Sequence, residues 1–87
     1  MSTDNELFEA ASLAVKSLPN RPDDNTMLQL YALYKQGSSG DVSGAKPGFF
    51  DFVGVAKYEA WEKQKGTSRQ DAQSSYIELV RKLGARF

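Results

Sequence analysis

The sequence predicts an all-α protein in which four helices form one domain over residues 1–87. In four segments, apolar residues recur at the three- and four-residue spacing of a helical face. Capping residues precede these segments, and prolines or glycines follow them. No stretch of useful length shows the strict alternation of a half-buried strand. Because the chain has no cysteine, its core must come from helix packing or be reinforced by a ligand.

The first helix is expected to begin near residue 4, because Thr3 and Glu6 have the spacing of a capping box. It ends before Pro19, since the residue before a proline avoids the helical region. Its apolar face consists of Phe8, Ala11, Val15 and Leu18, with Lys16 beside it.

The second helix is expected to begin after Pro22, where Asp23 and Asp24 can cap free backbone amides. Gly37 and the two serines after it are expected to stop the helix. Its stripe consists of Met27, Leu30, Tyr31 and Tyr34, with Leu28 and Ala32 extending it sideways.

Residues 37–51 form the longest irregular stretch and are rich in glycine. In so small a chain, a loop of this length is usually either functional or disordered. The apolar pair Phe49 and Phe50 suggests that the loop is pinned back onto the core. We therefore expect it to be ordered for much of its length.

The third helix is expected over residues 52–64, capped by Asp51 and ended by Gly66. The fourth is expected to begin at Ser68, which has capping-box spacing to Asp71. Inward positions are Val53, Ala56, Ala60 and Trp61 in the third helix, and Ala72, Tyr76, Leu79, Val80 and Leu83 in the fourth.

Charge and composition exclude several classes of function. Eleven basic and eleven acidic residues give a net charge of zero, which argues against broad attraction to nucleic acid or membranes. The chain lacks histidine and cysteine, so metal sites, bound cofactors and catalytic residues are not expected. It shows no apolar run long enough to cross a bilayer and no signal peptide. We expect a monomeric cytoplasmic protein without stable membrane insertion.

Two motif-like patterns have simpler explanations. Residues 40–47 are similar to a phosphate-binding loop, but Ala45 and Pro47 flank the lysine where that motif needs glycine and serine or threonine. The acidic residues that lie close in sequence are explained as helix caps and solvated helix faces. These are Asp23 with Asp24, and Glu59 with Glu62.

A more informative group of aromatic and basic residues lies near the end of the second helix. Tyr31, Tyr34 and Lys35 lie three and four residues apart, so they share a helical face. Lys57 next to Tyr58 forms a second aromatic–lysine neighbourhood. Together these groups could bind a nucleotide-containing ligand, with cations for phosphate and ring faces for a base. The tyrosines could equally be core residues whose hydroxyls reach solvent. Residue types alone leave both interpretations open.

From Phe8 to about Leu83, the sequence resembles the acyl-CoA-binding protein family. The most specific segments are residues 31–41 (YALYKQGSSGD), 47–51 (PGFFD), 56–61 (AKYEAW) and 65–68 (KGTS), followed by Ala72 and Tyr76. The resemblance implies a four-helix bundle in up-down-down-up order, with a shallow bowl for long-chain acyl-CoA esters. It implies sequestration and delivery of the thioester without covalent chemistry.

The resemblance also implies roles for individual residues. Tyr31 and Lys35 match residues that hold the ribose 3′-phosphate, Lys57 matches a second phosphate ligand, and Tyr76 matches the aromatic beside the adenine. Lys16 matches a basic residue at the site, and Ala32, Leu33 and Tyr34 lie within the same binding segment. Positions toward the acyl chain are Phe8, Met27, Leu28 and Tyr58.

The chain departs from the family pattern at several positions. Tyr58 stands where the family usually has tryptophan, and Val53 and Val55 stand where it often has lysine. Two other hypotheses remain. One is a helical protein-interaction module that docks through Phe49, Phe50 and the tyrosines. The other is an enzyme acting on acyl-CoA, which the absence of histidine and cysteine disfavours.

Overall fold

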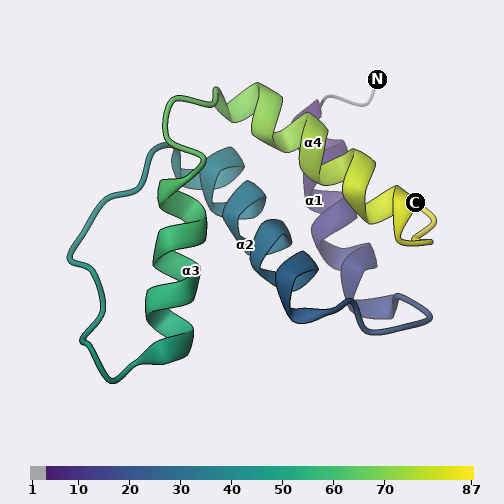
Figure 1. Ribbon diagram of the computed structural model, residues 1–87. Helices are drawn as coiled ribbons and strands as arrows, with labels where there is room; N and C mark the ends of the chain where they lie inside the picture. The colour runs from purple at the N-terminus through teal and green to yellow at the C-terminus, as the bar shows by residue number, and fades with distance from the viewer. Residues whose placement is uncertain (1–3) are drawn as a thin grey trace.

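The computed structural model describes residues 4–87, and within them it contains four α-helices and no strand (Figure 1). The all-α fold class is therefore confirmed. The helices are α1 (Asp4–Ala14), extended by the short 3₁₀ turn η1 (Val15–Ser17), α2 (Asp24–Ser39), α3 (Phe52–Glu62) and α4 (Arg69–Lys82). Within the same residues, no helix is both long and apolar enough to cross a membrane.

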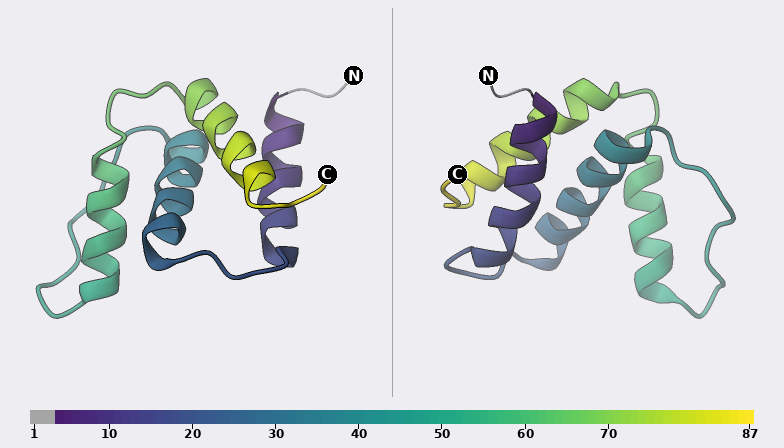
Figure 2. Two further views of the ribbon diagram at one scale, coloured as in Figure 1. Left: turned by 45° about the vertical axis from the view of Figure 1, so that its right-hand side comes forward. Right: turned by 180° about the vertical axis from the view of Figure 1, so that it is seen from behind.

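The four helices run in up-down-down-up order, as the family resemblance implied. Helices α2 and α3 run in the same direction, opposite to α1 and α4 (Figures 1 and 2). Helix α4 packs against both α1 and α2, and α2 also packs against α3. In space the order is thus α1, α4, α2, α3, and the molecule measures 42 × 28 × 15 Å. An α-helix with its side chains is about 10–12 Å across. The helices therefore form a thin curved layer that is open on one side.

The core lies where α4 meets α1 and α2. The sequence pattern predicted most of its members correctly but missed Leu33 and Ile77, which are also buried. The buried cluster consists of Phe8, Ala11, Leu30, Leu33, Tyr76, Ile77 and Val80. Each large apolar side chain buried in this way contributes about 1.5–3 kcal/mol.

Tyr76 is 4% exposed and stands in an aromatic cluster with Phe8 and Tyr34. The ring centroid of Phe8 lies 5.3 Å from that of Tyr34 in a stacked arrangement, and 5.2 Å from that of Tyr76 edge to face. Burial raises the pKa of the Tyr76 phenol above its ordinary value, and the neighbouring Tyr34 adds to the shift. The Tyr76 hydroxyl therefore stays neutral in the folded protein.

Side-chain caps begin three of the helices. Asp23 Oδ1 accepts from the Thr26 amide at 2.8 Å, and Asp51 Oδ1 accepts from the Gly54 amide at 2.9 Å. Ser68 Oγ accepts from the Asp71 amide at 3.0 Å. The predicted capping roles of Asp23, Asp51 and Ser68 are confirmed. The capping box proposed for Thr3 and Glu6 depends on Thr3, which lies outside the described residues.

Two predicted helix ends were wrong. Gly37 does not stop α2, because it lies buried inside the helix. A Cβ atom at Gly37 would lie 3.0 Å from side-chain atoms of Phe8 and Gln73, so this glycine allows close packing. The irregular connection therefore covers residues 40–51. Helix α3 ends at Glu62, two residues earlier than predicted.

The expectation that Phe49 and Phe50 pin this connection to the core was also wrong. Their side chains are 81% and 83% exposed, and Val53, which was predicted to face inward, is 66% exposed. Phe49 and Phe50 precede α3 in the loop, and Val53 lies in its exposed first turn. Of the predicted inward positions of α3, Trp61 is buried.

Polar contacts hold the connection in place instead. Gln36 Nε2 donates to Asp41 Oδ1 and to the Thr67 carbonyl oxygen, both at 2.8 Å. Trp61 Nε1 donates to the Gly40 carbonyl oxygen at 2.8 Å, and the Tyr58 hydroxyl donates to the Gly44 carbonyl oxygen at 3.2 Å. These contacts tie the first part of the loop to both of its flanking helices, so polar groups, and not Phe49 and Phe50, attach it to the fold.

Substituting Gly40→Ala should lower the free energy of unfolding by about 1–3 kcal/mol, the cost of backbone strain at such a residue. Gly40 ends α2 at φ 83° and ψ −152°, a conformation that side chains with a Cβ strongly disfavour. Urea denaturation provides the measurement. Gly48→Ala is the matched control, because Gly48 does not have a positive φ and its Cβ would meet no atom within 4 Å. Equal effects of the two substitutions would contradict this account.

Tyr76→Phe should weaken the loss of stability at alkaline pH. The unfolded chain ionises this phenol near its ordinary pKa of 10.0, whereas the folded protein retains the proton to higher pH. The stability due to the neutral phenol is therefore complete below pH 10.0 and is lost as the pH rises through the folded-state pKa. Denaturation curves between about pH 9 and pH 11 should fall less steeply for the variant than for the wild type. Parallel pH profiles would exclude the predicted shift.

Candidate ligand-binding site

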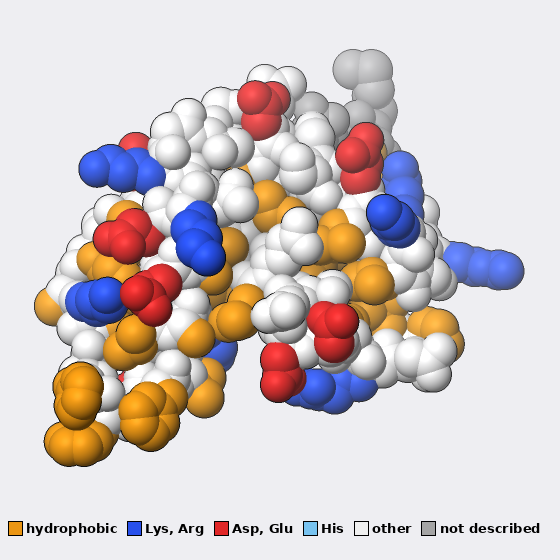
Figure 3. Space-filling view, viewed as in Figure 1, with side chains coloured by type: hydrophobic (Ala, Val, Ile, Leu, Met, Phe, Trp, Pro, Cys, Tyr) orange, Lys and Arg blue, Asp and Glu red, His pale blue; other side chains and the backbone are white. Residues whose placement is uncertain are grey.

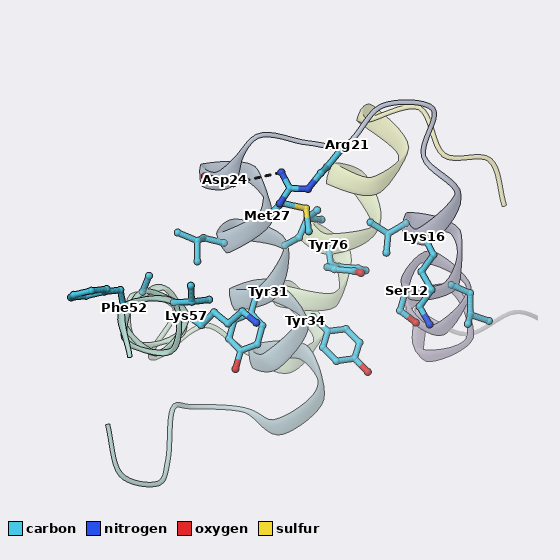
Figure 4. Close-up of a pocket in the computed structure, with 16 residues that line it drawn as sticks. Ser12, Lys16, Arg21, Asp24, Met27, Tyr31, Tyr34, Phe52, Lys57 and Tyr76 are labelled. Carbon is cyan, nitrogen blue, oxygen red and sulfur yellow. Dashed lines mark ion pairs between the residues drawn. The ribbon is translucent and has the colours of Figure 1, made fainter. Parts of the chain in front are cut away.

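A cavity of about 800 Å³ occupies the open side of the helical layer. Its walls come from α1 with η1 on one side and from α2 with α3 on the other, and Tyr76 of α4 contributes to its floor (Figure 4). Helix α4 packs against both α1 and α2 and does most to hold them together, although the stacked rings of Phe8 and Tyr34 also join α1 to α2 directly. The lining residues are Ser12, Leu13, Val15, Lys16, Arg21, Asp24, Met27, Leu28, Leu30, Tyr31, Tyr34, Phe52, Val53, Ala56, Lys57 and Tyr76.

The charges that line the cavity are mainly positive. Lys16, Arg21 and Lys57 supply three cations, whereas Asp24 supplies the one carboxylate in the lining. Arg21 Nη1 lies 3.6 Å from Asp24 Oδ1, but both side chains are largely exposed, so this pair is weak. Lys16 lies across the cavity from Lys57 (Figure 4). An anionic ligand would therefore meet cations from two opposite walls, although the whole chain is neutral.

The lysine and tyrosine of the second wall are in direct contact. Lys57 Nζ lies 5.4 Å from the ring centroid of Tyr31, a cation–π arrangement. The Lys57 ammonium group thus lies over the Tyr31 ring at one end of the cavity, and the Tyr31 hydroxyl projects from the far edge of that ring (Figure 4). Together they offer two hydrogen-bond donors to the same anion, as expected for a phosphate site.

A second contact of the same type lies along the same seam between α2 and α3. Lys35 Nζ lies 4.8 Å from the ring centroid of Trp61. Lys35 is four residues after Tyr31, and Trp61 is four residues after Lys57, so the two contacts are about 6 Å apart along the parallel helices. Lys35 does not line the cavity, yet its ammonium lies on the seam that Lys57 occupies.

Two tyrosines lie deeper in the cavity. Tyr34 is 41% exposed and therefore presents a ring face to a ligand, whereas Tyr76 is buried beneath it. Their ring centroids are 5.9 Å apart. Burial, and secondarily the neighbouring Tyr34, raises the pKa of Tyr76, so its ring is part of the floor as a neutral phenol near neutral pH.

Apolar side chains line the remainder of the cavity. Met27 and Leu28 of α2 lie in it as the resemblance implied, together with Leu13 of α1, which is 65% exposed. On α3, Phe52 and Val53 continue this surface to the edge of the molecule. A chain of methylene groups lying on these side chains would be partly removed from water.

The structure brings together most, but not all, of the site residues predicted from the sequence. Those that line the cavity are Lys16, Met27, Leu28, Tyr31, Tyr34, Lys57 and Tyr76. Those that do not are Phe8, Ala32, Leu33, Lys35 and Tyr58.

Each of these five has another position in the fold. Phe8 lies in the core beneath Tyr34, and Ala32 and Leu33 are also buried. The Tyr58 hydroxyl is bonded to the loop at Gly44. Buried residues of this kind support the site from below and are not free to contact a ligand directly. A ligand-binding role for Lys35 stays a prediction.

Sequence reasoning missed several lining residues, of which Arg21 is the most important. It lies in the connection before α2, where the residues Arg21 to Asp24 were interpreted only as a helix start. Leu13 carried a recognisable signal, because it is a large apolar residue outside the stripe of its helix. The other lining residues without a predicted site role are Ser12, Val15, Asp24, Leu30, Phe52, Val53 and Ala56.

Comparison with known proteins identifies the family. A family model described as acyl CoA binding protein matches residues 5–80. The chain is 55% identical over 82 residues to an acyl-CoA-binding protein homolog of Drosophila melanogaster, covering 94% of this chain and 95% of the relative. It is 46% identical over 82 residues to the acyl-CoA-binding protein of Saccharomyces cerevisiae, covering 94% of each chain.

Solved structures agree with this assignment. The crystal structure of Oryza sativa acyl-CoA-binding protein 2 has a TM-score of 0.88 at 34% identity, covering 93% of this chain and 90% of that one. The solution structure of the yeast acyl coenzyme A binding protein has a TM-score of 0.74 at 47% identity, covering 91% and 92%. The fold and the sequence thus give the same answer, and the chain belongs to the acyl-CoA-binding protein family.

Proposed function

We propose that this protein binds long-chain acyl-CoA esters without covalent chemistry and serves as an intracellular carrier and pool former for them. Its membership of the acyl-CoA-binding protein family supports this function. The observation that carries the proposal is the combination of phosphate-binding and apolar surfaces in a single cavity of about 800 Å³. An acyl-CoA needs both surfaces, because it joins a phosphorylated nucleotide to a hydrocarbon chain.

The phosphates of the ligand would bind at the seam between α2 and α3. There the Lys57 ammonium group lies 5.4 Å from the ring centroid of Tyr31, whose hydroxyl would be a second donor. Lys35 would join them by moving its ammonium from the face of Trp61 to the phosphate. A cation–π contact at an exposed site is worth about 0.5–1 kcal/mol, less than the roughly 1.5–3 kcal/mol of a charged hydrogen bond. The exchange is therefore favourable.

Lys16 and Arg21 would contact phosphates from other sides of the cavity. Arg21 would have to give up its weak exposed pair with Asp24, which lies at 3.6 Å. The adenine ring would lie on the aromatic floor, where Tyr34 is 41% exposed and Tyr76 is buried beneath it. Stacking a base on an aromatic side chain is worth about 1–3 kcal/mol in nucleic-acid systems.

The acyl chain would cross the apolar part of the cavity along Leu13, Met27, Leu28 and Val53. Each methylene removed from water contributes about 0.8 kcal/mol, so a long chain adds much of the affinity. The free energy of binding is considerably smaller than the total of these contributions, because the ligand and the side chains lose freedom of motion on association. Both parts of the ligand are therefore needed for tight binding.

We also propose that the chain is one acyl-CoA-binding domain that works as a monomer in the cytoplasm. We propose no catalytic activity, because the usual nucleophiles and bases of thioester chemistry, cysteine and histidine, do not occur in the sequence. A pure protein-interaction module is disfavoured, since it gives no reason for cations and phenols to share a cavity.

Titration calorimetry with palmitoyl-CoA, free palmitate and coenzyme A tests the proposed function. Palmitoyl-CoA should bind far more tightly than either of its parts, because neither part reaches both the seam and the apolar wall. Native mass spectrometry of freshly purified protein should in addition reveal a co-purified coenzyme A ester. Binding of palmitate as tight as that of palmitoyl-CoA would overturn the phosphate-centred account.

Lys35→Ala and Lys57→Ala should each weaken palmitoyl-CoA binding by roughly ten- to a hundredfold, the loss expected for one charged hydrogen bond. Thermal unfolding should change little, since each ammonium group makes one cation–π contact, worth about 0.5–1 kcal/mol. Lys63→Ala is the matched control, because this exposed lysine of the same region does not line the cavity. If Lys57→Ala binds like the control, the seam is not the phosphate site. Unchanged binding by Lys35→Ala alone would remove Lys35 from the site.

A further inference from the structure

A cluster of large apolar side chains projects from one end of the molecule. It consists of Phe49, Phe50, Phe52 and Val53, which we call the aromatic tip, and its members are 81%, 83%, 75% and 66% exposed. The space-filling view shows hydrophobic side chains gathered at the corner where the loop meets α3 (Figure 3). The ring centroids of Phe49 and Phe50 are 5.0 Å apart, edge to face. The two rings thus contact each other, although neither is buried.

The fold does not require apolar residues in the aromatic tip. The turn that leads into α3 is formed by backbone and carboxylate groups: the Asp51 amide donates to the Gly48 carbonyl oxygen at 2.9 Å, and Asp51 caps α3. The loop itself is fastened at Gly40, Asp41 and Gly44, well before the tip. Exposed apolar patches that do not stabilise a fold mark surfaces that bind another molecule.

The aromatic tip is continuous with the cavity. Phe52 and Val53 belong to both, since they also line the apolar wall. Lys57 lies one helical turn beyond Val53 on the same face of α3 and leads on to the cationic seam. A hydrocarbon chain could therefore pass from the outer end of the molecule into the cavity along uninterrupted apolar surface.

The charges around the aromatic tip suit a phosphate-rich surface. Residues 42–58 contain Lys46, Lys57 and, as their one acidic residue, Asp51, which gives a net charge of +1. The Asp51 carboxylate already accepts a helix-capping hydrogen bond. Glu59, the residue that follows this stretch, lies with Oε2 3.3 Å from Lys46 Nζ. That pair is half exposed and therefore weak, so an anionic surface could compete with Glu59 for the lysine.

We propose that the aromatic tip inserts shallowly and reversibly into the surface of a lipid bilayer, so that the cavity opens toward acyl-CoA held in the membrane. This inference rests on the proposed function. A projecting cluster of rings needs no complementary pocket in a fluid bilayer surface, whereas a second protein would have to supply one. Aromatic side chains are favoured at that depth, and lysines are favoured at the level of the lipid phosphates.

The ligand gives the contact a physical purpose. An acyl chain that leaves a membrane through water exposes methylenes at about 0.8 kcal/mol each. Phe52 and Val53 would replace that water while the chain moves from bilayer to cavity. The aromatic tip would thus speed the collection of acyl-CoA without changing its affinity in solution.

Flotation of the ligand-free protein with vesicles of phosphatidylcholine and phosphatidylserine provides the test. The wild type should float with the vesicles, and the double variant Phe49→Ser, Phe50→Ser should bind them roughly tenfold or more weakly, because two rings no longer leave water. Phe87→Ser is the matched control, since this aromatic residue is exposed but lies outside the tip. It should float like the wild type.

Two further measurements distinguish a failure of the membrane inference from a failure of the proposed function. The double variant should keep the wild-type affinity for palmitoyl-CoA in vesicle-free calorimetry, because Phe49 and Phe50 do not line the cavity. It should collect palmitoyl-CoA from vesicles more slowly in stopped-flow experiments. Loss of palmitoyl-CoA binding by the wild type would overturn the proposed function, whereas the ligand-free flotation result would still stand.

Three outcomes would overturn the inference itself. The first is a wild type that does not associate with vesicles, and the second is a double variant that floats as well as the wild type. The third is concentration-dependent dimerisation in analytical ultracentrifugation that the double substitution abolishes. That result would assign the aromatic tip to a second copy of the chain.

Discussion

The buried side-chain amide of Gln36 holds the two halves of the binding site together. This residue is fully buried near the end of α2, where Nε2 donates to both the Asp41 carboxylate and the Thr67 carbonyl. Asp41 lies just after α2 and Thr67 lies just after α3, so one amide ties the start of the long connection and the C-terminal end of α3 to α2. The Gly66 amide also donates to Asp41, and together these donors lower the pKa of the carboxyl. Together with the Trp61–Gly40 hydrogen bond, this junction positions α3 against α2 and so places Lys57 beside Tyr31.

The open shape of the fold follows from which helices touch. Helix α4 occupies the space between α1 and α2 on one face only, so the opposite face is left hollow. The core under the hollow is aromatic, with Phe8 packed against Tyr34 and Tyr76. A floor of rings combines support with stacking surface. The same three residues thus stabilise the fold and shape the base of the cavity.

The local excess of positive charge in the cavity, and not the net charge of the chain, suits the site to an anionic ligand. The chain is formally neutral, yet three cations line the cavity against one carboxylate. Lys57 and Lys35 are also held by the faces of Tyr31 and Trp61, which limits the rotamer freedom they would lose on binding a phosphate. Cation–π contacts along one seam therefore prepare the lysines for an anion without neutralising them.

The sequence alone determined the helices, their caps and the family. These features follow from local rules: the spacing of apolar residues, a capping side chain within three residues, and the order of motif residues along the chain. Most of the cavity was predictable for the same reason, since Tyr31, Tyr34 and Lys57 lie within motif segments. Contacts between distant parts of the chain decided the features that the sequence did not predict. Gly37 stays inside α2 because Phe8 and Gln73 approach it from other helices, a contact that no local pattern encodes.

Three further features depended on tertiary structure in the same way. Lys35 turns to Trp61 because α2 and α3 run parallel at contact distance. Arg21 reaches the cavity because the connection before α2 crosses its edge, and Phe49 and Phe50 remain exposed because polar contacts elsewhere already secure their loop. In each case the outcome depends on what another part of the chain places nearby. Spacing along a helix specifies which residues share a face, but only packing specifies what that face meets.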